Sequence, residues 1–79
     1  MSDGTDRAGA VLTYIAESIV DEPENVEVDV DGNTLRLHVA PDDMGKVIGR
    51  RGRVAQAIRT VVRAAGAKDG TDVNVDIVD

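Results

Sequence analysis

Two glycines separated by two arginines, at residues 49–52, interrupt a stretch of the sequence that otherwise has a helical pattern. Glycine lacks a Cβ atom, so it permits backbone dihedrals and close approaches that other residues do not. Apolar residues recur at helical spacing on both sides, in residues 41–48 and in residues 53–65. The sequence therefore predicts a short and a longer helix joined by a tight, positively charged turn. An aspartate at residues 42–43 is expected to cap the first helix, and Gly66 to end the second.

Alternation of apolar and polar residues marks three other segments, residues 26–31, 35–39 and 73–77, as strands. Asp31-Gly32-Asn33 lies between the first two and is a signal for a tight turn, because glycine tolerates a positive φ. Each predicted strand has a single apolar face, so we expect helices to cover the sheet on one side only.

Another helix is predicted over residues 8–20, where apolar side chains follow the i, i+3, i+4, i+7 spacing. Thr5 or Asp6 is expected to cap its start. The resulting order is α-β-β-α-α-β, an α+β fold of two layers with a three-stranded mixed sheet and all helices on one face. The 79 residues fit one domain. We expect a flexible N-terminus at residues 1–6 and the domain at residues 7–79.

Positive charge is concentrated in one part of the chain. The formal net charge is −6, from 15 acidic and 9 basic residues, which by itself argues against an anionic partner. Residues 44–68 nevertheless contain no acidic residue and most of the basic ones. These are Lys46, Arg50, Arg51, Arg53, Arg59, Arg63 and Lys68. Because salt screens charges over about 10 Å, this patch can bind an anion locally despite the acidic remainder.

The turn at residues 49–52 has the properties of a phosphate-binding loop. The helix after it directs free N–H groups and the positive end of its dipole towards the turn. Arg50 and Arg51 add charge and several hydrogen-bond donors, and Lys46 and Arg53 flank them. The simpler interpretation is a plain turn with solvated arginines. It leaves unexplained why two arginines stand at a helix start, where the helix dipole disfavours cations.

No set of residues points to catalysis, a metal or a cofactor. The chain has no cysteine, its one histidine, His38, has no second ligand nearby, and no nucleophile is paired with a base. Tyr14 is the only aromatic residue, so the sheet lacks an aromatic stacking platform. Arg59 and Arg63 fit a solvated helix face. No signal peptide and no membrane-spanning apolar run is found, so we expect a cytoplasmic protein without a membrane partner.

The run from Val47 to Ile58, VIGRRGRVAQAI, resembles the signature of KH domains, and the predicted element order is similar to the bacterial, type II arrangement of that family. The loop of these domains clamps about four nucleotides. The resemblance implies a cytoplasmic, non-catalytic protein that binds single-stranded RNA, as a homodimer or as the partner of a second KH protein. The residues implied at the RNA-binding surface are Lys46, Val47, Ile48, Gly49, Arg50, Arg51, Gly52, Arg53, Val54 and Ile58.

In this interpretation the loop holds the phosphate backbone and the bases lie in an adjacent apolar groove. The walls of that groove are expected from Val47, Ile48, Val54 and Ile58. Ala55 departs from many KH domains, which have a large aliphatic residue three positions after the second glycine. A shallower groove is therefore expected beside Ala55.

Two other functions fit parts of the pattern. A KH-like domain can serve mainly for dimerisation or partner binding, with weak binding of nucleic acid, including DNA. An exposed apolar face on residues 53–65 would support that function. A DNA-binding helix–turn–helix also joins two helices by a glycine turn, but it rarely needs two glycines. The long helix here offers only Gln56 for reading base edges.

Overall fold

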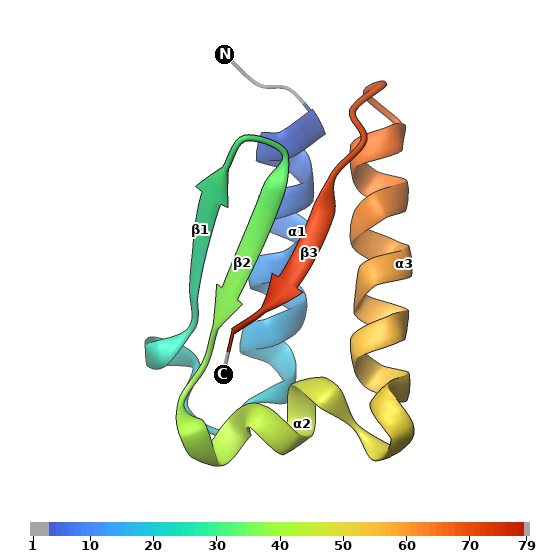
Figure 1. Cartoon of the computed structure of the whole chain (residues 1–79). Helices are drawn as coiled ribbons and strands as arrows, with labels where there is room; N and C mark the ends of the chain where they lie inside the picture. The colour runs from blue at the N-terminus through green and yellow to red at the C-terminus, as the bar shows by residue number, and fades with distance from the viewer. Residues whose placement is uncertain (1–3, 79) are drawn as a thin grey trace.

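The computed structural model describes residues 4–78, which form three α-helices and one three-stranded sheet (Figure 1). The elements are α1 (Gly4–Ile19), β1 (Glu27–Asp31), β2 (Thr34–His38), α2 (Met44–Ile48), α3 (Arg53–Ala67) and β3 (Asn74–Ile77). Short 3-10 turns lie between them at Pro23–Asn25, Pro41–Asp43 and Arg50–Gly52. The predicted α-β-β-α-α-β order is confirmed.

The sheet has the order β1-β2-β3 and is mixed, as predicted. β1 and β2 form an antiparallel hairpin in which Val30 is paired with Leu35. β3 runs parallel to β2, with Val75 beside Leu35. A parallel pair needs a crossover, which α2 and α3 provide. In Figure 1, α1 and α3 lie on one side of the sheet, and α2 crosses below its lower end.

The core lies between the sheet and the two long helices, and it is built from the apolar positions that the sequence periodicity predicts. Leu12, Leu35, Leu37, Val62 and Val73 are all 0% exposed. Burial of a side chain of this size contributes roughly 1.5–3 kcal/mol. α1 packs against α3. The first helix therefore supports the helix that follows the basic turn.

The first helix begins at Gly4, earlier than the predicted start at residue 8. Gly4 is buried, and a Cβ atom there would overlap the side chain of Thr71. The lack of a side chain thus allows the helix to start against the loop before β3. Residues 4–6 belong to α1, and the residues expected to cap the helix lie within its first turn. Residues 1–3 of the expected flexible N-terminus lie outside the described residues.

Gly66 lies inside α3, although the sequence predicts it as the end of that helix. It is buried, and a Cβ atom there would lie 3.1 Å from the Thr71 carbonyl oxygen and 3.1 Å from Val73 Cγ2. Its carbonyl oxygen accepts hydrogen bonds from the N–H groups of Asp69 and Thr71, each at 3.0 Å. Gly66 therefore permits close packing of the helix end against the segment that leads into β3.

β1 is much less covered than its neighbour. Leu35 and Leu37 of β2 are fully buried, whereas Val28 of β1 is only partly buried and Val30 is 59% exposed. Alternation in the sequence correctly predicts this strand and the face on which its valines lie. It does not specify how far the helices extend over that face, so the exposure of Val30 is visible only in the structure.

Candidate functional site

The turn between α2 and α3 has an unusual backbone. Gly49 adopts φ 76° and ψ 173°, Arg51 adopts φ 60° and ψ 24°, and Gly52 adopts φ 73° and ψ 14°. Glycine enters the region of positive φ freely, whereas for other residues the left-handed conformation costs roughly 1–2 kcal/mol. Both glycines therefore stand at positions where the turn requires glycine.

Gly49 is also required by a contact with Val54, in the first turn of α3. A Cβ atom on Gly49 would overlap Val54 Cγ2 and would lie 2.9 Å from the Val54 backbone nitrogen. At Gly52 no atom beyond the glycine and its two chain neighbours lies within 4 Å of an added Cβ. The first glycine thus serves both packing and conformation, and the second serves conformation alone.

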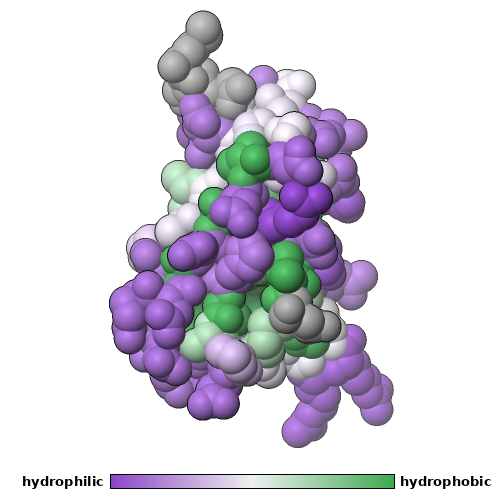
Figure 2. Space-filling model, turned by 60° about the vertical axis from the view of Figure 1, so that its left-hand side comes forward, coloured by the Kyte–Doolittle hydropathy of each residue, from purple (hydrophilic) through white to green (hydrophobic). Residues whose placement is uncertain are grey.

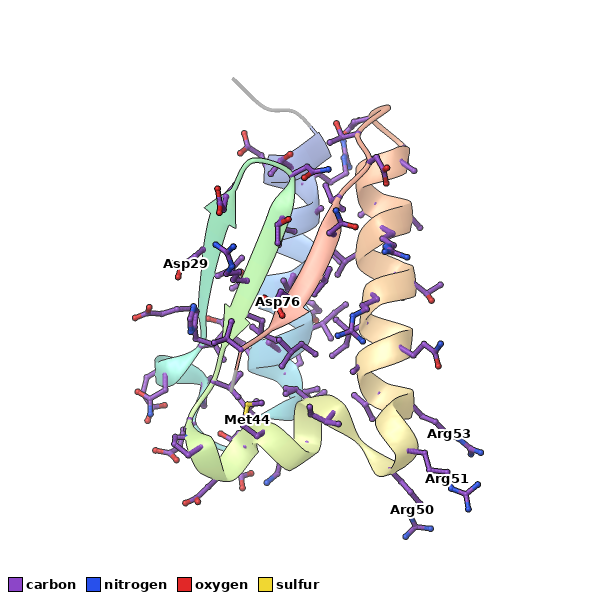
Figure 3. The ribbon with its side chains drawn as sticks, in the orientation of Figure 1. Asp29, Met44, Arg50, Arg51, Arg53 and Asp76 are labelled. Atoms are coloured by element: carbon purple, nitrogen blue, oxygen red, sulfur yellow. The ribbon has the colours of Figure 1, made fainter. Side chains whose placement is uncertain are left out.

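Arg51 is the non-glycine residue with a positive φ in the described part of the chain. Strained backbones of this kind are concentrated at functional sites, where the surrounding structure imposes them. Figure 3 shows the side chains of Arg50, Arg51 and Arg53 extending into solvent from the lower corner of the molecule. The strained turn therefore displays its arginines away from the body of the protein.

The charges of Arg50, Arg51 and Arg53 are accessible to a ligand in solvent. All are exposed, and the ion pairs found within residues 4–78 involve none of them. No side chain caps the first amides of α3. The corner thus presents three cations and a helix N-terminus to solvent, and a phosphate group can bind both.

Lys46 differs from these arginines because it is held by carboxylates. Its Nζ atom lies 3.1 Å from Asp21 Oδ2 and 3.5 Å from Asp43 Oδ1. Its hydrogen bond and charge interaction with Asp21 are the main causes that raise the pKa of Lys46 above its usual value. The lysine therefore links α2 to the segment after α1, and its charge is locally compensated rather than offered to a ligand.

Asp43 is a buried carboxylate, 1% exposed, and no local pattern in the sequence marks it as more than a helix cap. Its two oxygens accept hydrogen bonds of 3.0 Å from the N–H groups of Asp21 and Glu22. The bond from Asp21 is the main cause that holds the pKa of Asp43 below its usual value, although burial alone would raise it. As predicted, an aspartate stands at the N-cap position of the short helix α2, but the Asp43 side chain makes no capping hydrogen bond to that helix. Asp43 instead binds backbone amides beyond the end of α1.

The apolar residues expected to line an RNA groove are divided between core and surface. Val47 is 0% exposed, so its side chain belongs to the core and cannot form the wall of a surface groove. Ile58 is 3% exposed. Ile48 and Val54 are partly buried and reach the surface. Ala55 is 4% exposed, so its small side chain affects core packing rather than the depth of a surface groove.

Apolar surface remains around α2 and the carboxyl ends of β2 and β3. Four partly buried apolar residues stand on these elements or directly after them, namely Val39, Met44, Ile48 and Ile77. Figure 2 shows apolar surface in this region, above the hydrophilic side chains that protrude at the lower edge. Sequence reasoning identified only Ile48 among these residues, because each of the others has the pattern of an ordinary core position in its own element.

Arg59 and Arg63 lie further along α3 and contact β3. Arg59 Nε donates to the Val75 carbonyl oxygen at 3.3 Å, and Arg63 Nη2 donates to Asn74 Oδ1 at 3.4 Å. The sequence predicts a solvated face here. The structure adds hydrogen bonds that hold α3 beside the edge of the sheet.

A second apolar surface lies between α1 and α3. A groove of about 330 Å³ is lined by Ile15, Ile19, Arg53, Val54, Ala57, Ile58 and Val61. Val61 is 49% exposed and Ile19 is 37% exposed. This groove is the exposed apolar face on residues 53–65 that would support an interaction function.

A mixed three-stranded sheet with helices on one face, and a basic Gly-x-x-Gly turn between two helices of the crossover, defines a type II KH-like domain. The sequence profile described as "KhpA/KhpB, KH domain" matches residues 10–77, and the chain belongs to this family. KH domains bind ligands without catalysis, so the chain is not an enzyme. Within residues 4–78, none of the helices has both the length and the apolar character needed to cross a membrane.

Bacterial relatives are similar over most of the chain. The RNA-binding protein KhpA of Clostridium perfringens is 52% identical over 72 residues, which cover 86% of this chain and 96% of the relative. The RNA-binding protein KhpA of Caldanaerobacter subterraneus is 49% identical over 74 residues, covering 89% of this chain and 99% of the relative. The RNA-binding protein KhpA of Mycobacterium tuberculosis is 47% identical over 72 residues, covering 86% of each. No solved structure gives a significant match.

Proposed function

We propose that this protein binds single-stranded RNA and that the turn at residues 49–52 holds the phosphate backbone. The observation that carries the proposal is the cluster of Arg50, Arg51 and Arg53, which is exposed and has no ion pair within residues 4–78. The cluster adjoins the uncapped amides of α3. The naming of similar proteins as RNA-binding supports RNA as the ligand.

In the proposed mechanism the RNA backbone contacts a charged surface and the bases contact an apolar surface. Gly49 and Gly52 let the RNA backbone approach closely, and the arginines donate hydrogen bonds to phosphate oxygens. The bases then lie on the apolar surface that includes Ile48 and Met44. Unstacked bases can reach such a surface, whereas a duplex keeps its bases stacked and paired, so a preference for single strands follows.

Several residues expected at the binding surface receive other functions in this proposal. Val54 supports the turn from α3, because it packs against Gly49. Lys46 and Val47 are left out, since the first is ion-paired and the second is buried. Ile58 is 3% exposed and lines the groove between α1 and α3. The proposed RNA contacts are Met44, Ile48, Gly49, Arg50, Arg51, Gly52 and Arg53.

A charge reversal in the turn tests this function. The double variant Arg50→Asp, Arg51→Asp is expected to lose binding to a single-stranded RNA oligomer in a gel-shift assay while its circular dichroism spectrum stays unchanged. The double variant Arg63→Asp, Lys68→Asp makes the same change in net charge at the far end of α3 and is expected to retain most of the binding. Undiminished binding by the folded turn variant would remove the turn from the mechanism. Tighter binding of wild type to duplex DNA would favour a helix–turn–helix function.

A second function, dimerisation, is supported by the groove between α1 and α3. Val61 and Ile19 expose apolar area there that a partner would bury. The proposed partner is a second copy of the chain or a second KH protein resembling KhpB, and the shared KhpA/KhpB profile supports the latter. Sedimentation of Val61→Asp tests this surface, since the variant is expected to be monomeric under conditions in which wild type associates.

The cytoplasm is the proposed location of this activity. The support is indirect: the similar proteins are bacterial and are named as RNA-binding, and bacterial transcripts are made in that compartment. Fractionation of cells that carry a tagged chain is expected to recover the protein with the soluble, RNA-containing fraction. Recovery with the membranes would contradict this location.

A further inference from the structure

β1 is an open edge of the sheet. The order β1-β2-β3 leaves one side of β1 without a neighbouring strand within residues 4–78. A groove of about 420 Å³ borders β1 and α1, and its lining includes Tyr14, Val28 and Val30. Tyr14 is 73% exposed and Val30 is 59% exposed. A strand edge beside exposed apolar residues can accept a further strand, since its backbone groups are unpaired on that side.

Negative charge surrounds this edge. Glu17 lines the groove, and its lining includes no lysine or arginine. Glu27, Asp29 and Asp31 alternate with the valines along β1, so they lie on the opposite, outward face of the sheet. In Figure 3, Asp29 lies on that strand, far from the arginine corner.

The positive groups of the outward face do not balance these carboxylates. Arg36 lies 3.0 Å from Asp31 and 3.9 Å from Asp76, so it is shared between two acids. His38 Nε2 lies 2.8 Å from Asp29 Oδ2. Glu27 has no ion-pair partner within residues 4–78. The edge therefore keeps an excess of negative charge that a positive partner can complement.

The alternation of acidic and apolar residues along β1 determines which residue types an added strand needs on each face. Outward residues of the new strand would lie about 4.5–5.5 Å from those of β1, where opposite charges stabilise the pair and like charges destabilise it. Inward residues would meet Val30 and Tyr14 and must be apolar. A second copy of β1 is disfavoured because it would place carboxylates against carboxylates, and RNA is disfavoured for the same electrostatic reason.

We propose that the groove between α1 and β1 docks an extended segment of a partner protein, in which lysine or arginine alternates with apolar residues, as a fourth strand of the sheet. β1 has five residues, so the segment spans roughly 17 Å. The docked segment lies far from the turn at residues 49–52, so this inference does not depend on the proposed binding of RNA. A partner protein and an anionic ligand can be bound at the same time.

The test uses the blocked hexapeptide Lys-Val-Lys-Val-Lys-Val and the isotope-labelled full chain. Amide chemical shifts are expected to change in β1 and the facing part of α1, and the β1 amides are expected to become protected from exchange. Val30→Lys is expected to weaken binding at least about tenfold, because it removes apolar contact and adds a like charge. Ala64→Lys makes a similar change on the exposed face of α3 and is expected to leave the affinity unchanged. Circular dichroism checks that both variants are folded.

Several results would overturn the proposal. One is equal binding of the peptide Glu-Val-Glu-Val-Glu-Val, and another is unchanged affinity in folded Val30→Lys. A peptide with proline at a central residue whose N–H would donate to β1 should bind much more weakly, since proline has no N–H, and equal binding would rule out strand addition. Shift changes confined to the groove between α1 and α3 would assign the peptide to the dimerisation surface. Self-association of the wild-type chain that Val30→Lys abolishes would make a second copy the occupant.

Discussion

Val54 occupies the space that a side chain on Gly49 would need. This contact joins the end of α2 to the first turn of α3. The two glycines of the turn are therefore not equivalent, although the sequence presents them as a symmetric pair.

Alanine substitutions at Gly49 and Gly52 are expected to reduce the free energy of unfolding by different amounts. Gly52→Ala should reduce the free energy of unfolding by about 1–2 kcal/mol, the cost of a left-handed alanine, because nothing obstructs the new methyl group. Gly49→Ala should cost more, by about another 1–3 kcal/mol, because the methyl group would also overlap Val54. Urea unfolding of both variants measures the difference. A larger loss for Gly52→Ala would contradict the packing argument.

Asparagine substitutions at Arg51 and Arg50 remove the same charge but are expected to change the free energy of unfolding differently. Asparagine tolerates the left-handed region better than arginine, so Arg51→Asn should raise the free energy of unfolding by up to about 1 kcal/mol. Arg50→Asn has no such strain to relieve and serves as the matched control. Both should weaken RNA binding. Thermal unfolding and RNA titration of the two variants check this, and equal stability would show that the turn imposes no strain on Arg51.

The salt dependence of RNA binding should reflect the three free arginines. If about three phosphates are neutralised, log affinity should fall against log salt concentration with a slope near −2, since each contact with a single strand contributes about −0.7. Arg50→Gln should make the slope shallower by about 0.7. Lys46→Gln should change the slope little, because Asp21 and Asp43 already hold that charge. A slope near zero would contradict the phosphate clamp.

Acid should destabilise the fold through Asp43. The pKa of this group is lowered in the folded protein from its ordinary value of 3.8. Its ionisation therefore stabilises the fold fully above about pH 3.8, and this stabilisation is lost as the pH falls through the lowered folded pKa. Asp43→Asn should have a lower melting temperature than wild type at pH 7, and the gap should narrow below pH 3.8. Calorimetry from pH 7 to pH 3 measures this difference in melting temperature. A difference that stays constant with pH would show that ionisation of Asp43 does not stabilise the fold.

A dimer should bind long RNA more tightly than short RNA. Two turns in one assembly raise the effective concentration of the second site without any new contact. Titration with oligomers that span one or two sites, with sedimentation to establish the oligomeric state, tests this. Monomeric Val61→Asp should bind both lengths equally. If a confirmed wild-type dimer bound short and long oligomers with equal affinity, dimerisation would not strengthen RNA binding.

The fold was predictable from the sequence because its apolar residues follow two clear periods. The alternation at Leu35 and Leu37 and the helical spacing at Leu12 and Val62 mark faces that the structure buries completely. The long connection between β2 and β3 likewise indicated a parallel crossover. Packing between distant segments escaped prediction: Gly4 is buried against Thr71, and no local pattern signals that contact.

The candidate site was predictable in its backbone and only partly in its side chains. The spacing of Gly49 and Gly52 predicted the turn, and the structure assigns both glycines a positive φ. Lys46 looked identical to the neighbouring arginines, because the carboxylates that hold it come from other parts of the chain or from a position expected to cap a helix. Val47 looked as available as Ile48, since adjacent apolar residues at the end of a short helix do not reveal which of them faces the core.

The acidic face of the sheet and the basic corner, which Figure 3 places far apart, give the molecule an electrical polarity. Near a polyanion such a molecule experiences a torque that turns the arginine corner forward and the carboxylates away before any contact forms. Encounters then begin in a productive orientation more often than random collision allows, and they do so less as salt is added. A chain with an excess of six negative charges can therefore approach RNA quickly, because the arrangement of its charges matters more than their sum.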